Sequence, residues 1–269
     1  MRDVLDKLTR GEISVDQAEK TLKLLALQEI GNLAKLDIGR EARRGIPEIV
    51  IAEGKTPEDV VEIALGALTG QGRVIISRAK RQHAEAVKSV TPSDATFQWN
   101  QKAGILTIKS KDFAARRTGG KIGILGAGTS DIPIAEEVKV IAEEMGCEVT
   151  TAYDVGVAGI HRLFHPLEEM LDKDVDAIVV VAGREGALPS VVAGLVDVPI
   201  IAVPASFGYG FGASGISALM AMLQACPLGL AVVNVDGGVP AGTVAALIAN
   251  RAAKFRTSSK KKNARASSL

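Results

Sequence analysis

The chain has 269 residues, of which 47% are hydrophobic and 23% charged, and its formal net charge is +1. This length holds one large domain or two smaller ones, and the composition is that of an ordinary soluble protein. The low charge and an aromatic content of 3% argue against a nucleic-acid-binding protein, which needs a basic surface or a stacking platform.

Cysteine content and hydropathy indicate the compartment. Cys147 and Cys226 are the two cysteines of the chain, too few for a disulfide framework, and the N-terminal residues lack the apolar core of a signal peptide. The uncharged stretch 198–235 is long enough to span a membrane, but its glycines and prolines argue against a span. We therefore expect a cytoplasmic protein with no membrane association.

The first elements in chain order predict a small N-terminal α/β domain over residues 1–111. Residues 1–32 have a helical apolar stripe with a capping-box pair, Ser14 and Gln17. A charged connection follows, and a later helix is capped by Thr56 with a proline in its first turn. Strands are predicted at 48–52, 73–77, 96–99 and 105–108, and a further helix at 80–88.

A basic, glycine-terminated segment at 112–120 is the predicted linker to a second domain at 121–252. In that domain, strand, glycine-loop and helix patterns alternate, which predicts a doubly wound parallel sheet with ligands at the carboxyl ends of its strands. A basic tail at 253–269 is expected to be disordered. The predicted strands are 122–125, 148–153, 177–181, 200–203 and 230–235.

The stretch 198–238 contains the last two of these strands and a helix between them. Ser214 is the predicted cap of this helix, whose residues 217–223 are apolar on every side. Such a helix must be buried under its own sheet and under a second subunit, so we expect a homo-oligomer.

A glycine loop follows the first strand of the second domain. Gly128 lets the backbone approach a ligand, Thr129 and Ser130 add hydroxyl donors, and the free amides of the next helix attract phosphate. With Asp131, these residues predict a phosphate or nucleotide site. The alternative is a tight turn in which Asp131 caps the helix.

Two further loops carry groups that can act on a ligand. Arg184 and Glu185 follow the third strand, where a charged pair can face a ligand. His161 follows the second strand and can serve as acid, base or phosphate donor. A solvated loop is the alternative for each. Because no cluster has metal-ligand spacing, a metal would be held mainly by substrate phosphates.

Cys226 lies in apolar surroundings just after a predicted helix. The helix dipole at that end opposes the thiolate, and most cysteines in such places are inert packing residues. Position alone therefore favours a structural role. A positively charged substrate would favour the thiolate and with it a nucleophilic role.

Three motifs, GAGTSDIPIAEE, VAGIHRL and AGREGALPSVVAGLVDVPIIAVPAS, resemble in this order the signatures of carboxyaminoimidazole ribonucleotide mutase, a purine-pathway enzyme. In that family the loop matching Gly128–Asp131 binds substrate phosphate, and the histidine matching His161 is catalytic. The chain departs from that family at Glu185, at the segment QACPLG around Cys226 and in its additional N-terminal domain.

Those departures resemble the related family of pyridinium-3,5-biscarboxylic acid mononucleotide synthase, the carboxylase and hydrolase that begins nickel-pincer nucleotide synthesis for lactate racemase. Residues 36–40 and 45–56 resemble the N-terminal domain of that family. The resemblance covers nearly the whole chain except the basic tail. It implies a mutase-like second domain and an octameric assembly.

The resemblance implies that the chain carboxylates nicotinic acid adenine dinucleotide with carbon dioxide or bicarbonate and releases AMP, with Mg²⁺ as the metal. In this scheme Cys226 is the nucleophile and Glu185 the base, with His161 as a further catalytic residue. Residues that bind substrate or its phosphates would be Gly128, Thr129, Ser130, Asp131, Arg184, Gly186, Ser206 and Gly237. Two alternatives remain: a purine-pathway mutase that acts through His161, and a non-catalytic nucleotide-binding protein.

Overall fold

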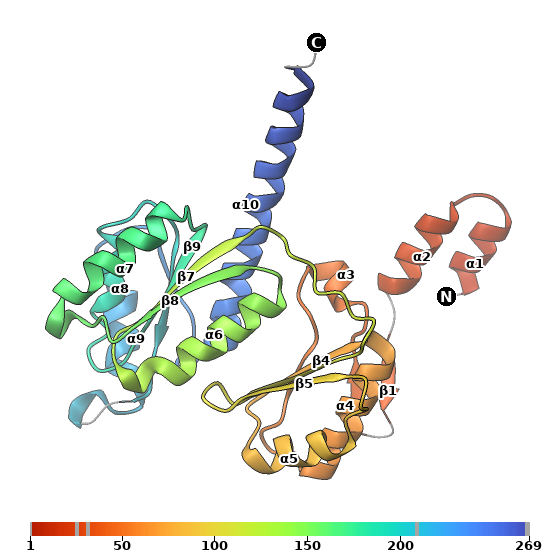
Figure 1. Ribbon diagram of the computed structural model, residues 1–269, viewed down its shortest axis with the longest axis horizontal. Coiled ribbons are helices and arrows are strands. Elements are labelled where there is room, and N and C mark those ends of the chain that lie inside the picture. The colour runs from red at the N-terminus through yellow and green to blue at the C-terminus, as the bar shows by residue number, and fades with distance from the viewer. Residues whose placement is uncertain (1, 25–26, 31–32, 208–209, 267–269) are drawn as a thin grey trace. The chain divides into compact units, whose positions relative to one another are not determined.

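The computed structural model describes residues 2–24, 27–30, 33–207 and 210–266 (Figure 1). The chain divides into two compact units between Ala114 and Ala115. The predicted linker 112–120 crosses this division, and its last residues pack on the second unit: the Thr118 hydroxyl donates to the Gly146 carbonyl at 2.9 Å. The packed part of the second unit therefore begins before residue 121.

The first unit starts with helices α1 (Arg2–Thr9) and α2 (Val15–Leu24). The predicted capping box precedes α2, because the Ser14 amide donates to the Gln17 side chain and the Gln17 amide to the Ser14 hydroxyl. The helical pattern was predicted to continue to residue 32, but an antiparallel pair follows α2 instead. It consists of β1 (Gln28–Ile30) and β2 (Ala34–Leu36), with Asn32 outside the described residues.

A four-stranded sheet forms the centre of the first unit, and α3 (Arg40–Arg44) precedes it. Helices α4 (Pro57–Gln71) and α5 (Arg81–Val90) bury Val60, Ile63 and Val87 in its core. The predicted cap of α4 is confirmed, since Thr56 forms a capping box with Asp59. The strands, in spatial order, are β3 (Ile49–Ile51), β4 (Arg73–Ser77), β6 (Ile105–Lys109) and β5 (Thr96–Asn100).

The second unit has the predicted doubly wound architecture, with five parallel strands in the order β11-β10-β9-β7-β8. Buried Val, Ile, Leu and Ala side chains fill its central strands, as is typical of a parallel sheet covered on both faces. The strands are β7 (Lys121–Gly126), β8 (Glu148–Tyr153), β9 (Ala177–Ala182), β10 (Ile200–Pro204) and β11 (Leu230–Val232).

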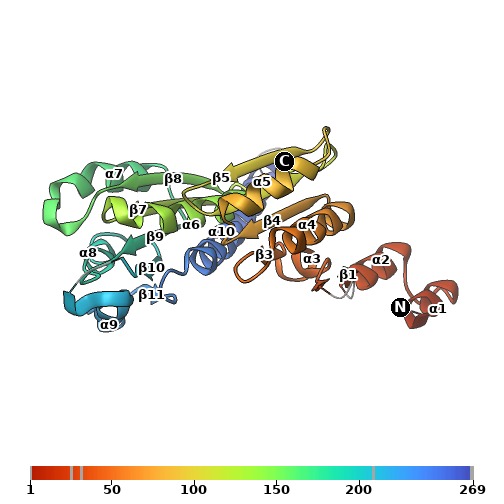
Figure 2. The same cartoon turned by 90° about the horizontal axis from the view of Figure 1, so that it is seen from below.

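Five helices cover the two faces of this sheet. Helices α6 (Ile132–Glu144) and α10 (Gly238–Ala266) pack together and on the central strands. The opposite face carries α7 (His161–Asp172), α8 (Leu188–Ala193) and α9 (Ile216–Leu223), whose buried side chains share one core with Ile178 and Val180 of β9. Figure 2 shows α8 and α9 at the β10–β11 end of the sheet.

The helix α9 differs from its prediction. It begins at Ile216 with Gly215 as its cap residue, and Ser214 makes no capping bond to it. Its own sheet buries Ala218 and Met222, whereas Met220 and Leu223 on the other side are 63% and 65% exposed. The next strand, β11, has three residues at the edge of the sheet and is not the buried six-residue strand that its composition predicts.

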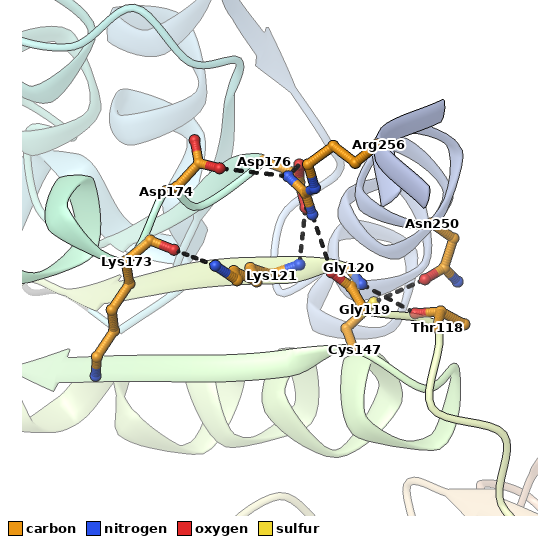
Figure 3. A network of polar contacts seen from close by, with 10 residues as sticks. All are labelled: Thr118, Gly119, Gly120, Lys121, Cys147, Lys173, Asp174, Asp176, Asn250 and Arg256. Atoms are coloured by element: carbon orange, nitrogen blue, oxygen red, sulfur yellow. Dashed lines mark hydrogen bonds and ion pairs between the residues drawn. The ribbon is translucent and has the colours of Figure 1, made fainter. Parts of the chain in front are cut away.

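A polar network joins Asn250 and Arg256, within α10, to the segment that starts the sheet (Figure 3). Arg256 donates to both carboxylate oxygens of Asp176, at 2.6 and 3.1 Å, and to the Gly119 carbonyl at 2.9 Å. Asp176 also accepts from the Lys121 amide at the start of β7. Ala253 is buried and Arg256 is paired, so α10 is packed on the sheet beyond residue 252, where a disordered tail was expected to begin. The helix itself is described to Ala266.

We expect Arg256→Ala to lower the free energy of unfolding by about 2 kcal/mol, because it leaves the buried Asp176 carboxylate without its ion-pair partner. Chemical denaturation of the full chain measures the change. Arg251→Ala, which removes only a cation–π contact with Phe255, serves as the control and should cost about 0.5 kcal/mol. Equal effects of the two variants would contradict this assignment.

Candidate active site

The strand order of the second unit places a switch point between β7 and β9. From β7 the chain moves to β8 on one side, and it then returns to β9 on the other side. Loops that leave the two strands at their carboxyl ends therefore separate and leave a crevice, which is the general ligand position in open parallel sheets.

A pocket of about 620 Å³ occupies this crevice, within the size range of small-molecule sites. Its lining comes from the loops after β7, β8, β9 and β10 and from the start of α7. Of the predicted site residues, the pocket lining includes Gly128, Ser130, Asp131, Arg184, Glu185 and Ser206.

Asp131 joins the two loops that border the switch point. Its side chain is 5% exposed, and one carboxylate oxygen accepts from the Gly128 amide at 2.8 Å. Burial raises the pKa of Asp131, while hydrogen bonds from the Gly128 and Gly183 amides act in the opposite direction. The carboxylate is therefore engaged with backbone amides, whereas the neighbouring Ser130 is exposed on the pocket.

Gly183 lies where three segments converge. A Cβ atom at this position would lie 2.6 Å from the Phe207 carbonyl oxygen and 3.5 Å from both the Ala205 carbonyl oxygen and an Asp131 carboxylate oxygen. The absence of a side chain thus allows the loops after β9 and β10 to approach each other. Ser206 is fixed in the same region, since its amide donates to Asp236 at 2.8 Å.

Charged side chains surround the pocket. Arg184 and Glu185 are exposed and follow β9, and Arg184 has a left-handed backbone with φ of 52°. Strained residues of this kind are concentrated at ligand sites. Arg162 at the start of α7 forms an ion pair with Asp154 after β8, and both line the pocket. The site can therefore present two guanidinium groups to phosphate or carboxylate and one exposed carboxylate as a base.

The remaining predicted residues lie outside the pocket lining. Thr129 is exposed beside it, and His161 is the exposed first residue of α7, before Arg162. Gly186 packs on α9, where a Cβ atom would lie 2.8 Å from the Ala218 carbonyl oxygen. Gly237 is buried at the start of α10.

Cys226 is exposed, but it lies at the amino ends of the strands, whereas the pocket lies at their carboxyl ends. It belongs to the turn between α9 and β11, whose Gly229 carbonyl accepts from the Ile200 amide at the amino end of β10. The pocket lies at the carboxyl ends of the same strands. Cys226 and Glu185 therefore do not lie close together within one chain, although the expected reaction needs both of them at one substrate ring.

Two charged pocket residues, Asp154 and Arg162, were missed by the sequence reasoning. Arg162 stands next to His161 in the motif VAGIHRL, whose spacing does not indicate which of the two side chains enters the pocket. Asp154 is the first residue after β8, so its position at a strand end was an available signal. The structure places both on the pocket and orients Arg162 through its ion pair and a bond to the Gly159 carbonyl.

Within the residues that the structure describes there is no group of three or more His, Cys, Asp or Glu side chains placed to hold a metal ion. No helix in the described ranges combines the length and apolar character that crossing a membrane requires.

Comparison with known proteins identifies relatives of both units. A family model described as AIR carboxylase matches residues 121–267, and one described as a LarB/PurE-like N-terminal domain matches residues 27–111. An uncharacterized protein of Methanocaldococcus jannaschii is 44% identical over 93% of this chain and 96% of its own length. N5-carboxyaminoimidazole ribonucleotide mutases of M. jannaschii and Thermotoga maritima are 34% and 26% identical over 46% of this chain, and over 75% and 66% of their own lengths.

Gly183→Ala should lower the free energy of unfolding by about 1–3 kcal/mol, because the added methyl group forces the loops after β9 and β10 apart. Thermal or chemical denaturation measures the loss. Gly194→Ala is the matched control, because its Cβ atom would have no neighbour closer than 3.5 Å. A Gly183 variant as stable as the control would show that the loops do not need this close approach.

The raised pKa of Asp131 predicts a pH-dependent difference between the wild type and Asp131→Asn. Burial favours the protonated form of Asp131 in the folded state. Its contribution to the free energy of unfolding is therefore fully present below the ordinary pKa of 3.8 and is lost as pH rises through the raised pKa. The unfolding free energy of the wild type minus that of the variant should therefore fall as pH rises from acid to neutral. Denaturant titrations across that pH range measure the difference, and Asp197→Asn, at an exposed position, controls for the loss of one charge. If the wild-type minus variant difference rises with pH, the prediction is wrong.

Proposed function

This chain belongs to the AIR carboxylase family and carries a LarB/PurE-like N-terminal domain, and from this premise we propose that it carboxylates the pyridinium ring of nicotinic acid adenine dinucleotide. The family makes it a carboxylase- or mutase-type enzyme. The proposed products are AMP and pyridinium-3,5-biscarboxylic acid mononucleotide, for the synthesis of a nickel-pincer cofactor. The observation that carries the proposal is the position of Glu185, an exposed acid that lines the same pocket as the glycine loop at Gly128.

The pocket supports a substrate that has both a phosphate and a reacting ring. Ser130 and the amides at the start of α6 suit a phosphate, and Arg162 and Arg184 suit a phosphate or the ring carboxylate. Glu185 lies across the switch point from Ser130, after β9. A ring held by its phosphate at one loop can therefore present a C–H bond to the acid at the other.

The proposed chemistry uses the charge of the substrate. The Cys226 thiolate bonds to the ring carbon opposite the nitrogen, and a ring electron pair moves to that nitrogen, which gives a neutral dihydropyridine. The enamine carbon then bonds to the carbon of CO₂. Glu185 removes the proton from that carbon, and the nitrogen electron pair expels the thiolate, so that the aromatic pyridinium re-forms with a second carboxylate.

A divalent cation belongs to the hydrolytic half of the proposal. Carboxylates on the pocket are those of Asp131, Asp154 and Glu185, but the described residues supply no three-ligand cage. Asp131 is bonded to amides and Asp154 is paired with Arg162. Mg²⁺ would accordingly take most of its ligands from water and the substrate phosphates, as it does in many phosphate-cleaving sites. When bound, it would supply charge neutralisation at the phosphoanhydride.

A purine-pathway mutase is the second candidate, and the M. jannaschii mutase among the relatives favours it. That activity would act through His161, which is not among the pocket-lining residues, whereas Glu185 is. Incubation of the pure protein with each substrate and labelled bicarbonate separates the two candidates. Label that enters only the imidazole nucleotide would replace the first proposal with the second.

We expect Glu185→Gln to abolish carboxylation while leaving a mass shift on Cys226 after incubation with the dinucleotide, because the adduct forms but cannot lose its ring proton. Cys226→Ala should lose both the activity and the mass shift. Intact-protein mass spectrometry and label incorporation measure the two effects, and the pocket-distant Cys147→Ala is the control for thiol loss. Carboxylation retained in either variant would exclude the covalent scheme.

A further inference from the structure

We propose that the phenyl ring of Phe207 stacks on the cationic ring of the substrate and selects for that charge. This inference rests on the proposed function, because it names the side chain that holds the ring whose C–H bond faces Glu185. Its starting observation is an aromatic side chain on the pocket. Phe207, in the loop after β10, is 48% exposed and is the one aromatic residue in the described lining.

The loop after β10 is seated on the loop after β9. A Cβ atom at Gly183 would lie 2.6 Å from the Phe207 carbonyl oxygen, and the Ser206 amide, next to Phe207, donates to Asp236 at 2.8 Å. The backbone of Phe207 is therefore held directly beside Gly183, which precedes Glu185 by two residues, and the side chains of Phe207 and Glu185 line one pocket. A flat ring stacked on the phenyl ring can thus present its edge to the carboxylate.

Phe207 has more apolar surface available to a ligand than the other large apolar residues of the described lining. Leu188 is 1% exposed, and Val157 is partly buried against the same hydrophobic core of the second unit. An exposed phenyl ring forgoes the stabilisation that burial of its surface would provide. A flat ligand that covers the ring supplies this burial, and stacked aromatic pairs gain a further attraction from their geometry. The position of Phe207 therefore suits an aromatic ligand.

The charges around Phe207 favour a cationic ring. The face of an aromatic ring attracts a cation that lies within about 6 Å of the ring centre. Phe207 belongs to the stretch 198–235, which carries no charge in the sequence, so a cation meets no like charge on this loop. Glu185 on the neighbouring loop supplies the opposite charge at the pocket. A pyridinium has its positive charge within the ring, whereas adenine is neutral, so Phe207 should distinguish the two.

The proposed chemistry determines which kinetic constant Phe207 affects. The phenyl ring covers one face of the pyridinium and leaves the other face for the addition of the thiolate. Once the thiolate has bonded, the ring is a neutral dihydropyridine, and the attraction between a cation and the phenyl ring is lost. Phe207 therefore stabilises the bound substrate more than the adduct, so its loss should raise KM and leave kcat nearly unchanged.

The first experiment compares two mononucleotides by titration calorimetry with the full-length protein. Nicotinic acid mononucleotide has a cationic ring and AMP a neutral one, and both carry a ribose phosphate. Phe207→Leu keeps the apolar bulk but removes the ring face, so it should weaken the binding of nicotinic acid mononucleotide by about three- to thirtyfold and that of AMP by about twofold or less. Phe207→Tyr keeps the ring and should bind both as the wild type does. An equal loss for the two nucleotides, no loss for either, or a wild type that does not bind nicotinic acid mononucleotide overturns the proposal.

A second measurement reports contact with the ring directly. Trp99, in β5 of the first unit, is the single tryptophan of the chain, so Trp99→Phe/Phe207→Trp places the one indole on the pocket. Nicotinic acid mononucleotide should quench its fluorescence and produce a charge-transfer absorption band, because an electron-rich indole then stacks on an electron-poor cation. Trp99→Phe/Phe255→Trp, with an indole at an exposed position of α10, is the control and should show neither effect. Absence of the band at a saturating nucleotide concentration overturns the proposal.

Steady-state kinetics with the dinucleotide separates this inference from the proposed function. Phe207→Leu should raise KM by about three- to thirtyfold and keep kcat within about twofold of the wild-type value. If the wild type carboxylates the dinucleotide and Phe207→Leu leaves KM unchanged, the proposed function stands and this inference fails. If the wild type does not carboxylate the dinucleotide but the charge-transfer band forms, the proposed function fails and the stacking site stands.

Discussion

The single direction of the five strands in the second sheet constrains everything else in this unit. Because all strands end at the same edge, the loops with Ser130, Arg184 and Glu185 meet there without any special arrangement of the chain. The same constraint sends every returning helix to the opposite edge. A residue that follows such a helix, as Cys226 follows α9, is removed from the pocket by the full length of a strand.

Much of this architecture could be predicted from the sequence. Buried strands such as β9 and β10 have continuous β-branched and aliphatic runs, and the capping box at Thr56 marks a helix start by local chemistry alone. Both signals are local. The errors arose where tertiary context decides: β1 has too few residues to show an alternation, and α10 continues past residue 253 because Ala253 and Arg256 find partners far away in the chain.

The pocket residues that directly follow a predicted strand could be predicted from the sequence. Gly128, Ser130 and Glu185 follow strands that the pattern locates well, so their convergence follows from topology. Arg162 was missed because its side-chain direction depends on the ion pair with Asp154, which no spacing rule indicates. The distance between Cys226 and the pocket was not predicted, because it depends on the direction in which α9 crosses the sheet.

The brevity of β11 also determines how copies of this chain can meet. A long edge strand is a template on which a neighbouring molecule can add its own strand, with indefinite growth as the hazard. At the β11 edge of this sheet only three residues are available, and the turn at Gly229 ends the ladder. This edge of the sheet therefore offers a neighbouring molecule little backbone to which it could add a strand.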